Sequence, residues 1–242
     1  MSGTDEPVSA AIAVAVTKEA PGAPEAQDDI NPPDFDGAVR TKNTLPSRDT
    51  LHRIADLPVL DREGKPHPFK SLYAERGRVL IVFVRHFFCG NCQEYLRVLS
   101  ASITADALAR AAGGAARIVV VGCGEPPLID MYAEAAACAF PIYADPTRQL
   151  YDELDMVSTL ALGEKPAYMG RTSMWASIVR SISQGLRQIP QGLVLKAGNQ
   201  RQVGGEFLFE SAADVEVTWC HRMKTTRDHA EVAELKKVLG LT

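Results

Sequence analysis

Residues 79–92 read Val-Leu-Ile-Val-Phe-Val-Arg-His-Phe-Phe-Cys-Gly-Asn-Cys. The first six residues form an unbroken apolar run, which is typical of a strand covered on both faces, as in a parallel sheet with helices above and below. The stretch ends in a Cys-x-x-Cys pair, Cys89 and Cys92. A buried strand that leads directly into two thiols predicts a chemical site at the end of that strand.

A helix is expected to follow the pair, over residues 92–112. Its apolar residues recur at helical spacing, and they are Tyr95, Leu96, Leu99, Ile103, Ala107 and Leu108. Gly113-Gly114 is expected to end the helix, because glycine readily adopts the left-handed conformation found after helices. A second β-rich run follows at residues 118–121. The segment therefore predicts a strand–helix–strand crossover.

The remaining elements alternate between strand and helix patterns. Strands are expected over residues 58–61, 141–143, 193–195, 207–209 and 215–219, and helices over 126–137, 147–154, 175–183 and 229–239. Gly64 should supply the turn after the first of these strands, and Asp228 should cap the last helix, which Gly240 ends. This order predicts an α/β fold with a mixed central β-sheet flanked by helices.

The first 45 residues differ from the rest of the chain. Residues 1–45 are rich in Ala, Pro, Asp and Glu and contain one aromatic residue, Phe35. Such a segment buries too little apolar surface to offset its ordering entropy, so we expect a disordered or loosely packed tail. A tail that docks on the domain through Phe35 is the alternative. Residues 46–242 are expected to form one globular domain.

Composition narrows the class of protein. Apolar residues make up 46% of the 242-residue chain and charged residues 23%, which suits a domain with a full core. The net charge of −4 argues against a nucleic-acid partner. No stretch approaches the roughly 20 apolar residues that cross a membrane, and acidic residues precede the early apolar run, so no membrane contact or secretory signal is expected. Five cysteines, an odd number, favour a reducing compartment, the cytoplasm.

The dithiol has a physical reason to be reactive. A thiol at the amino end of a helix faces unpaired N–H groups and the positive end of the helix dipole, which stabilise the thiolate, the nucleophilic form. Cys89 is therefore expected to lie exposed at the start of the helix and to attack, and the more buried Cys92 to resolve the product. Arg85 or His86 would add positive charge if either points toward the sulfur. The alternatives are an inert structural pair, or a zinc site that would need Cys220 and His221; we expect no metal.

Other residues of chemical interest carry weaker signals. Gly122-Cys123-Gly124 follows a strand as a dinucleotide-binding loop would, but the third glycine is missing, which favours a turn. Cys123 is expected either near the site, at the shared strand edge, or as a small apolar residue. His86 is expected either to take part in catalysis or to be a strand-end residue that bonds to the backbone. Cys138 and Cys220 are expected to be core or near-surface thiols, and His221 and His229 to serve strand-end and capping environments.

Several of these segments resemble a known family. They are Phe-Val-Arg-His-Phe-Phe-Cys-Gly-Asn-Cys-Gln-Glu-Tyr at 83–95, Asp-Pro-Thr-Arg at 145–148, Gly-Gly-Glu-Phe at 204–207 and Asp228-His229. Over residues 50–240 the chain resembles the AhpC/TSA antioxidant-domain family of peroxiredoxin-like proteins, and the arrangement looks most like its fungal members. The resemblance implies a thioredoxin-like (peroxiredoxin-like) fold for the domain of residues 46–242.

The resemblance also implies a function: thiol-dependent reduction of a peroxide, an organic endoperoxide or a disulfide, without a cofactor. Cys89 would be the peroxidatic cysteine and Cys92 the resolving one. Thioredoxin or glutathione would supply electrons, and a homodimer is left open. Pro190 resembles the proline before the late strand of thioredoxins, where it is cis; a plain trans-proline loop is the alternative. The substrate groove is expected to include Phe88, Pro190 and Cys123.

The chain departs from the family pattern at two places. The proline and threonine that precede the peroxidatic cysteine by seven and three residues in peroxiredoxins are replaced by Val82 and His86. The arginine before the late strand is missing, and Arg85, Arg148 and Arg187 are the available substitutes. These differences favour an organic substrate or thiol exchange over hydrogen peroxide. A binding or scaffold module without redox cycling, and a small-molecule biosynthetic enzyme, are the alternative functions.

Overall fold

A mixed sheet organises the chain. The computed structural model describes residues 41–75, 77–169, 195–212 and 214–241. Its seven-stranded sheet has the order β2-β1-β5-β4-β3-β6-β7. The strands are β1 Pro58–Leu60, β2 Pro66–Pro68, β3 Gly77–Phe83, β4 Ala116–Gly122, β5 Ile142–Ala144, β6 Gly205–Ser211 and β7 Val215–Arg222.

Two supersecondary units build the centre of the sheet. Strands β3 and β4 pair in parallel and are joined by the helices α2 (Gly90–Ser102) and α3 (Ala105–Ala109). Strands β6 and β7 form an antiparallel pair, β6 lies antiparallel to β3, and α8 (Val232–Val238) follows. A βαβ unit joined in one sheet to a ββα unit is a thioredoxin-like arrangement, so the predicted fold class is confirmed.

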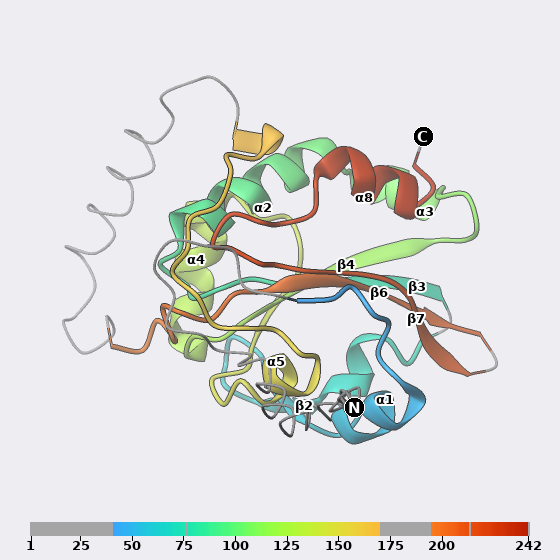
Figure 1. Cartoon of the computed structure of the whole chain (residues 1–242). Helices are drawn as coiled ribbons and strands as arrows, with labels where there is room; N and C mark the ends of the chain where they lie inside the picture. The colour runs from blue at the N-terminus through green and yellow to red at the C-terminus, as the bar shows by residue number, and fades with distance from the viewer. Residues whose placement is uncertain (1–40, 76, 170–194, 213, 242) are drawn as a thin grey trace, which may run out of the picture.

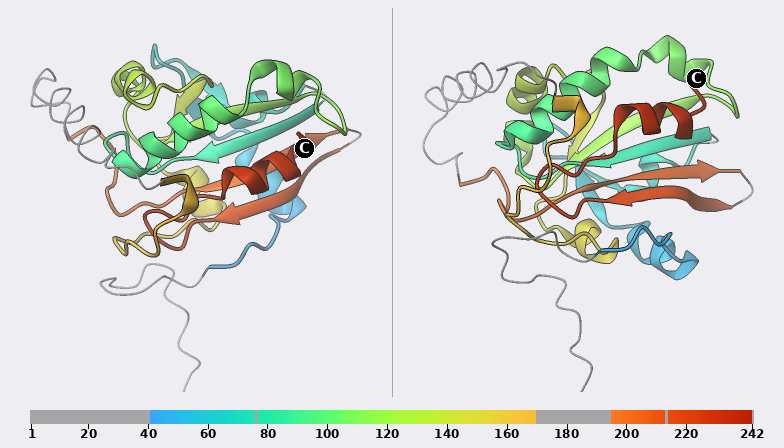
Figure 2. Two further views of the ribbon diagram at one scale, coloured as in Figure 1. Left: turned by 90° about the horizontal axis from the view of Figure 1, so that it is seen from above. Right: turned by 45° about the horizontal axis from the view of Figure 1, so that its top comes forward.

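Helices cover both faces of this sheet (Figure 1). On one face lie α2, α3, α4 (Ile129–Ala136) and α8, and on the other lie α1 (Arg48–Ile54) and α5 (Gln149–Glu153). Successive residues of β3 enter different cores: Leu80 and Val82 join the first, Val79 and Ile81 the second. Because side chains alternate across a strand, burial on both faces explains the unbroken apolar run. The turned views of Figure 2 show the same layers.

The predicted helix over residues 92–112 is wrong in its length. The helix stops at Ser102, Ile103 is extended, and a second short helix begins at Ala105. The cause is local: the side chain of Thr104 accepts the N–H of Ala107 at 3.2 Å, and such a cap starts a new helix. The apolar spacing continues through the break, so this spacing does not reveal where the first helix ends.

The last helix also differs from its prediction. It begins at Val232 with Glu231 as the N-cap, rather than at His229 behind Asp228. Asp228 instead accepts the backbone N–H of Lys224 at 2.8 Å, which closes a turn after β7. His229 thus precedes the helix, and its side chain is free to turn toward the sheet.

Most other elements match their predictions within about two residues. Residues 126–137 form a 3₁₀ turn, η2 (Pro126–Leu128), that leads into α4, and Gly64 has the expected positive φ of 79°. Leu195, the end of a predicted strand, lies instead in a turn and is 90% exposed. Some predictions concern residues outside those that the structure describes: the helix over 175–183, Phe35, Arg187, Pro190 and residues 193–194.

The described N-terminal residues lie along the edge strand β7. Arg222 donates to the backbone carbonyls of Lys42 and Thr44 at 2.8 and 2.7 Å, and its own N–H donates to the side chain of Asn43 at 2.8 Å. The last part of the predicted tail of residues 1–45 is therefore attached to the domain. Within the described parts of the chain, no helix has both the length and the apolar character to cross a bilayer.

Candidate active site

Cys89 lies where β3 gives way to α2. The N–H of Val84 still continues the sheet by donating to Val121 at 2.8 Å, and the N–H of Cys89 donates to His86 at 2.9 Å, which turns the chain. Cys89 is the N-cap residue of α2, and Cys92 lies in the first turn of that helix. The predicted strand–dithiol–helix junction is thus formed, with Cys89 at the positive end of the helix dipole.

Phe87 locks this junction against the end of β4. Its buried ring lies against two glycines, and a Cβ atom at Gly122 or Gly124 would come within 2.3 or 2.4 Å of that ring. The N–H of Phe87 donates to the carbonyl of Ala197 at 2.9 Å. The Gly122-Cys123-Gly124 sequence is therefore explained by close packing in a turn, without a dinucleotide.

Arg85 holds a positive charge against the Cys89 sulfur. Its Nη1 lies 3.2 Å from Sγ of Cys89. The rest of the guanidinium is fixed, because Nε donates to the carbonyl of Gln202 at 3.1 Å and Nη2 to that of Gln200. Arg85 is buried, so solvent screens this charge little.

The surroundings favour the thiolate of Cys89. A hydrogen bond from the Cys92 thiol, together with the charges of Arg85 and His86, holds the pKa of Cys89 well below its usual value, although burial opposes the shift. A thiol of low pKa is nucleophilic near neutral pH. One expectation is wrong: only 4% of Cys89 is exposed, so the sulfur lies at the helix start but beneath the surface.

Cys92 has the opposite character. It is fully buried, and burial raises its pKa well above the usual value, with the neighbouring Cys89 adding to the effect. Its sulfur lies 3.3 Å from Nε2 of His229. The two thiols are therefore unlike: Cys89 is disposed to be a thiolate and Cys92 to keep its proton. All five cysteines of the chain are free.

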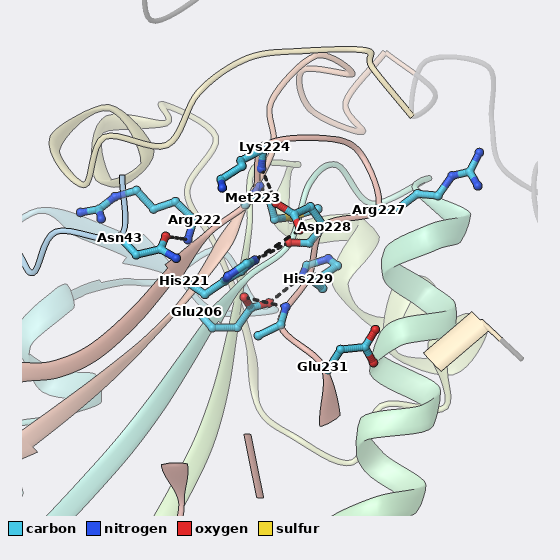
Figure 3. A network of polar contacts seen from close by, with 12 residues as sticks. Asn43, Glu206, His221, Arg222, Met223, Lys224, Arg227, Asp228, His229 and Glu231 are labelled. Carbon is cyan, nitrogen blue, oxygen red and sulfur yellow. Dashed lines mark hydrogen bonds and ion pairs between the residues drawn. The ribbon is translucent and has the colours of Figure 1, made fainter. Parts of the chain in front are cut away.

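His229 and Glu206 are the functional candidates that sequence reasoning missed (Figure 3). Nδ1 of His229 lies 2.6 Å from Oε1 of Glu206, which belongs to β6, and both side chains are fully buried. The ring of His229 stacks on Tyr95 of α2, with the centroids 4.1 Å apart and the planes 4° apart. A charged residue inside the apolar strand 205–209 was the available signal, since buried carboxylates need a partner.

His86 lies close enough to the dithiol for its charge to affect Cys89. Its Nδ1 is buried and has no hydrogen-bond partner among the residues the structure describes. Burial lowers its pKa, the charge of Cys89 acts in the opposite direction, and Arg85 lowers it further. His86 is therefore available to a ligand at the site. Phe88 is half-buried and packs on the same core as the dithiol.

Cys123 does not join the dithiol. It packs in the core on the other face of the sheet, and burial raises its pKa to about 12. Cys220 also belongs to that second core, whereas Cys138 is half-buried beside the first. A zinc site built from the dithiol with Cys220 is therefore not formed, and the described segments contain no group of three or more side chains placed to hold a metal.

Comparison with known proteins gives consistent matches. The sequence profile of the AhpC/TSA antioxidant enzyme family matches residues 99–225. Peroxiredoxin-like 2C of Homo sapiens is 31% identical over 190 residues, which cover 78% of this chain and 79% of that protein. The chloroplastic thioredoxin-like protein AAED1 of Arabidopsis thaliana is 27% identical over 207 residues, 83% of this chain and 75% of that one.

A solved structure, peroxiredoxin Q of Xanthomonas campestris, superposes with a TM-score of 0.47 at 15% identity, over 81% of this chain and 91% of that chain. The profile match begins after the dithiol. The roles of Cys89 and Cys92 therefore depend on their geometry. The two named relatives come from an animal and a plant, so the likeness to fungal members stays a prediction.

Proposed function

Because the chain belongs to the AhpC/TSA antioxidant enzyme family, we propose that it is a thiol-dependent oxidoreductase that reduces a peroxide through Cys89 and Cys92. The observation that carries the proposal is the contact between Arg85 and the Cys89 sulfur, 3.2 Å long, at the amino end of α2. It gives the chain a stabilised thiolate next to a second thiol that keeps its proton.

In the first step the Cys89 thiolate attacks the terminal oxygen of a hydroperoxide, the one that carries the hydrogen. A bond forms between Sγ and that oxygen, the O–O bond breaks, and the other oxygen leaves as an alkoxide that takes a proton. Sγ becomes a sulfenic acid, oxidised by two electrons, while the peroxide is reduced to an alcohol. His86, whose Nδ1 has no hydrogen-bond partner within the described segments, is the side chain we assign to the substrate oxygens.

In the second step Cys92 attacks the sulfenic sulfur. The new bond joins the two sulfurs, the S–O bond breaks, and water leaves. Thioredoxin or glutathione then returns the disulfide to two thiols, so the cycle needs no cofactor beyond the dithiol. A reducing compartment such as the cytoplasm would supply these donors.

Arg85 takes the part that peroxiredoxins give to an arginine before a late strand. It approaches from the end of β3, only four residues before Cys89, and its anchors are the backbone carbonyls of Gln200 and Gln202. The small exposed fraction of Cys89, 4%, favours a small peroxide over a folded protein disulfide as the oxidant. An organic hydroperoxide or endoperoxide remains the preferred class.

The test is a count of thiols and a map of disulfides after one equivalent of an organic hydroperoxide. We expect the native protein to lose two thiols and to form the Cys89–Cys92 disulfide. Cys89→Ser should keep all its remaining thiols, and Cys138→Ser, which changes a half-buried thiol outside the site, should behave like the native protein. A native dithiol that survives hydroperoxides, endoperoxides and oxidised thioredoxin alike would instead favour a binding module.

A further inference from the structure

The proposed cycle leaves one chemical requirement unmet. Only a thiolate attacks a sulfenic or disulfide sulfur, yet burial raises the pKa of Cys92 well above its usual value. Burial outweighs the charge of Arg85 and a backbone hydrogen bond from that residue, which both act to lower the pKa of Cys92, and the guanidinium itself is directed at Cys89. The Cys92 thiol therefore needs a base within reach at the moment of attack.

We propose that Glu206 and His229 form a buried acid–base relay in which Nε2 of His229 takes the proton of Cys92. His229 contacts a reacting atom and is the catalytic residue, and Glu206 is a positioning residue that acts through it. The inference depends on the proposed function only in that Cys92 must attack an oxidised Cys89.

The hydrogen-bond geometry supports this direction of proton transfer. The bond of 2.6 Å between Nδ1 of His229 and Glu206 assigns the ring proton to Nδ1, because a carboxylate only accepts. Nε2 then presents a lone pair to the Cys92 sulfur at 3.3 Å. The thiol proton that Cys92 donates to the Cys89 thiolate turns to Nε2 once Cys89 is oxidised and is no longer a thiolate. The second oxygen of Glu206 accepts the backbone N–H of Ala230 at 3.3 Å, which fixes the carboxylate.

Packing holds the imidazole in this orientation. Tyr95 stacks against it in nearly parallel planes, and Tyr95 stands three residues after Cys92 on the same helix, α2. Removing a carboxylate and an imidazole from water is costly, and a pair of apolar side chains often stabilises a core as well. A buried carboxylate–imidazole pair that touches a reactive thiol is therefore better explained by chemistry than by stability.

The other titratable groups near the relay do not replace it. Two of them are phenols, Tyr95 of α2 and Tyr168 of η3 (Ala167–Met169). Two others are carboxylates, Asp228 and Glu231, which line a cavity together with His229. Burial raises the pKa of both phenols, so these stay protonated near neutral pH. The cavity, of about 730 Å³, is lined by Lys224 and Arg227 as well, and the His229 side chain itself is fully buried beside it.

The step balances without a further reactant. His229 takes the proton from Cys92, the thiolate attacks Sγ of Cys89, and the sulfur–sulfur bond forms as the S–O bond breaks. The departing hydroxide takes the proton back from Nε2 and leaves as water. The electron pair of the Cys92 thiolate becomes the sulfur–sulfur bond, the electron pair of the S–O bond leaves with the hydroxide, and the imidazole returns to its neutral form.

The test separates resolution from the attack on peroxide. In rapid-mixing experiments His229→Asn should form the Cys89 sulfenic acid at the native rate, but it should close the disulfide about 10²- to 10⁴-fold more slowly. The sulfenic acid should accumulate and be trapped by dimedone. Glu206→Gln, of nearly the same shape, should give a smaller loss in the same step. His221→Asn is the matched control, because this histidine lines the same cavity but bonds to the backbone of Asp228.

The pH profile distinguishes a base from a structural role. In His229→Asn closure should rise with pH more steeply than in the native protein, because hydroxide replaces the imidazole, and Glu206→Gln, which keeps the imidazole, should lie between the two. Disulfide closure at native rates and with a native pH profile in both variants would overturn the relay. So would equal losses in the sulfenic acid step and the closing step, because these would indicate a general disturbance.

A second oxidant makes the relay testable without peroxide activity. Methyl methanethiosulfonate converts the Cys89 thiolate into a methyl disulfide, and attack by Cys92 then releases methanethiol. Slow release from His229→Asn, with native release from His221→Asn, supports the relay even if no peroxide is ever reduced. Peroxide reduction with equal methanethiol release from all three proteins keeps the proposed function and removes the relay.

Discussion

Replacing Arg85 by methionine should move the ionisation of Cys89 toward the ordinary behaviour of a thiol. Methionine keeps much of the length of the side chain and removes the guanidinium that lies 3.2 Å from Sγ. Two unit charges at that distance attract by about 5 kcal/mol at an effective dielectric constant of 20, before the loss of hydration is counted. Hydrogen bonds to charged groups contribute about 1.5–3 kcal/mol net, and we take this smaller figure for the contact.

That energy translates into a measurable shift. Since about 1.4 kcal/mol is a factor of ten, the thiol–thiolate equilibrium of Cys89 should move about 10- to 150-fold toward the thiol in Arg85→Met. The assay is the rate of alkylation by iodoacetamide against pH, in a Cys138→Ser background that removes the half-buried thiol. The midpoint should lie at higher pH in the variant, and Arg85→Lys should fall between the two proteins.

A second arginine provides the control. Arg148 bonds to the side chain of Gln202 at 3.4 Å, whereas Arg85 contacts the Cys89 sulfur, so Arg148→Met removes a nearby cation but not the contact. We expect its alkylation profile to match the native one. If the profiles of Arg85→Met and the native protein coincide, Arg85 does not stabilise the thiolate and the electrostatic argument fails.

Three further predictions concern stability. Tyr151→Phe should lose about 1–3 kcal/mol in urea unfolding, because the buried hydroxyl that donates to Val84 and Val121 is removed; an unchanged midpoint would contradict this. Gly122→Ala should lose about 1–3 kcal/mol through overlap with the Phe87 ring, and less in a Phe87→Leu background; equal losses in both backgrounds would exclude this overlap as the cause. Because the pKa of Cys89 is lowered in the folded protein, the unfolded chain binds more protons below about pH 8.5. The free energy of unfolding should therefore rise with pH from the folded pKa up to that value, and calorimetry of Cys89→Ser should show a flatter rise. A parallel rise in both proteins would contradict the linkage.

The sequence predicts the central part of the site because its signals are local. An apolar run, two thiols three residues apart and a helical pattern are all read within residues 79–112, and the structure forms the strand, the junction and the helix there. The break before α3 is missed because a single capping residue, Thr104, decides it while the apolar spacing continues. The exposure of Cys89 is likewise set by packing between distant segments.

The relay residues are beyond the reach of such local reasoning. Glu206 and His229 are 23 residues apart, on β6 and before α8, and they meet Cys92 only when the sheet and α2 are assembled. Interpreting His229 as a helix residue depended on Asp228 as the cap, and that side chain closes a different turn. The face of the sheet on which Cys123 lies also depends on tertiary structure, because successive residues at the end of a strand point to opposite faces.

The central claim is that the sulfur of Cys89 is the atom that peroxide oxidises, and a protein that cannot complete the cycle tests it most directly. In Cys92→Ser the sulfenic acid has no resolving thiol, so intact and peptide mass spectrometry after one equivalent of hydroperoxide should find one added oxygen atom, located on Cys89. Oxygen on Cys123, Cys138 or Cys220 instead, or an unmodified protein under conditions that oxidise the native dithiol, would contradict the account.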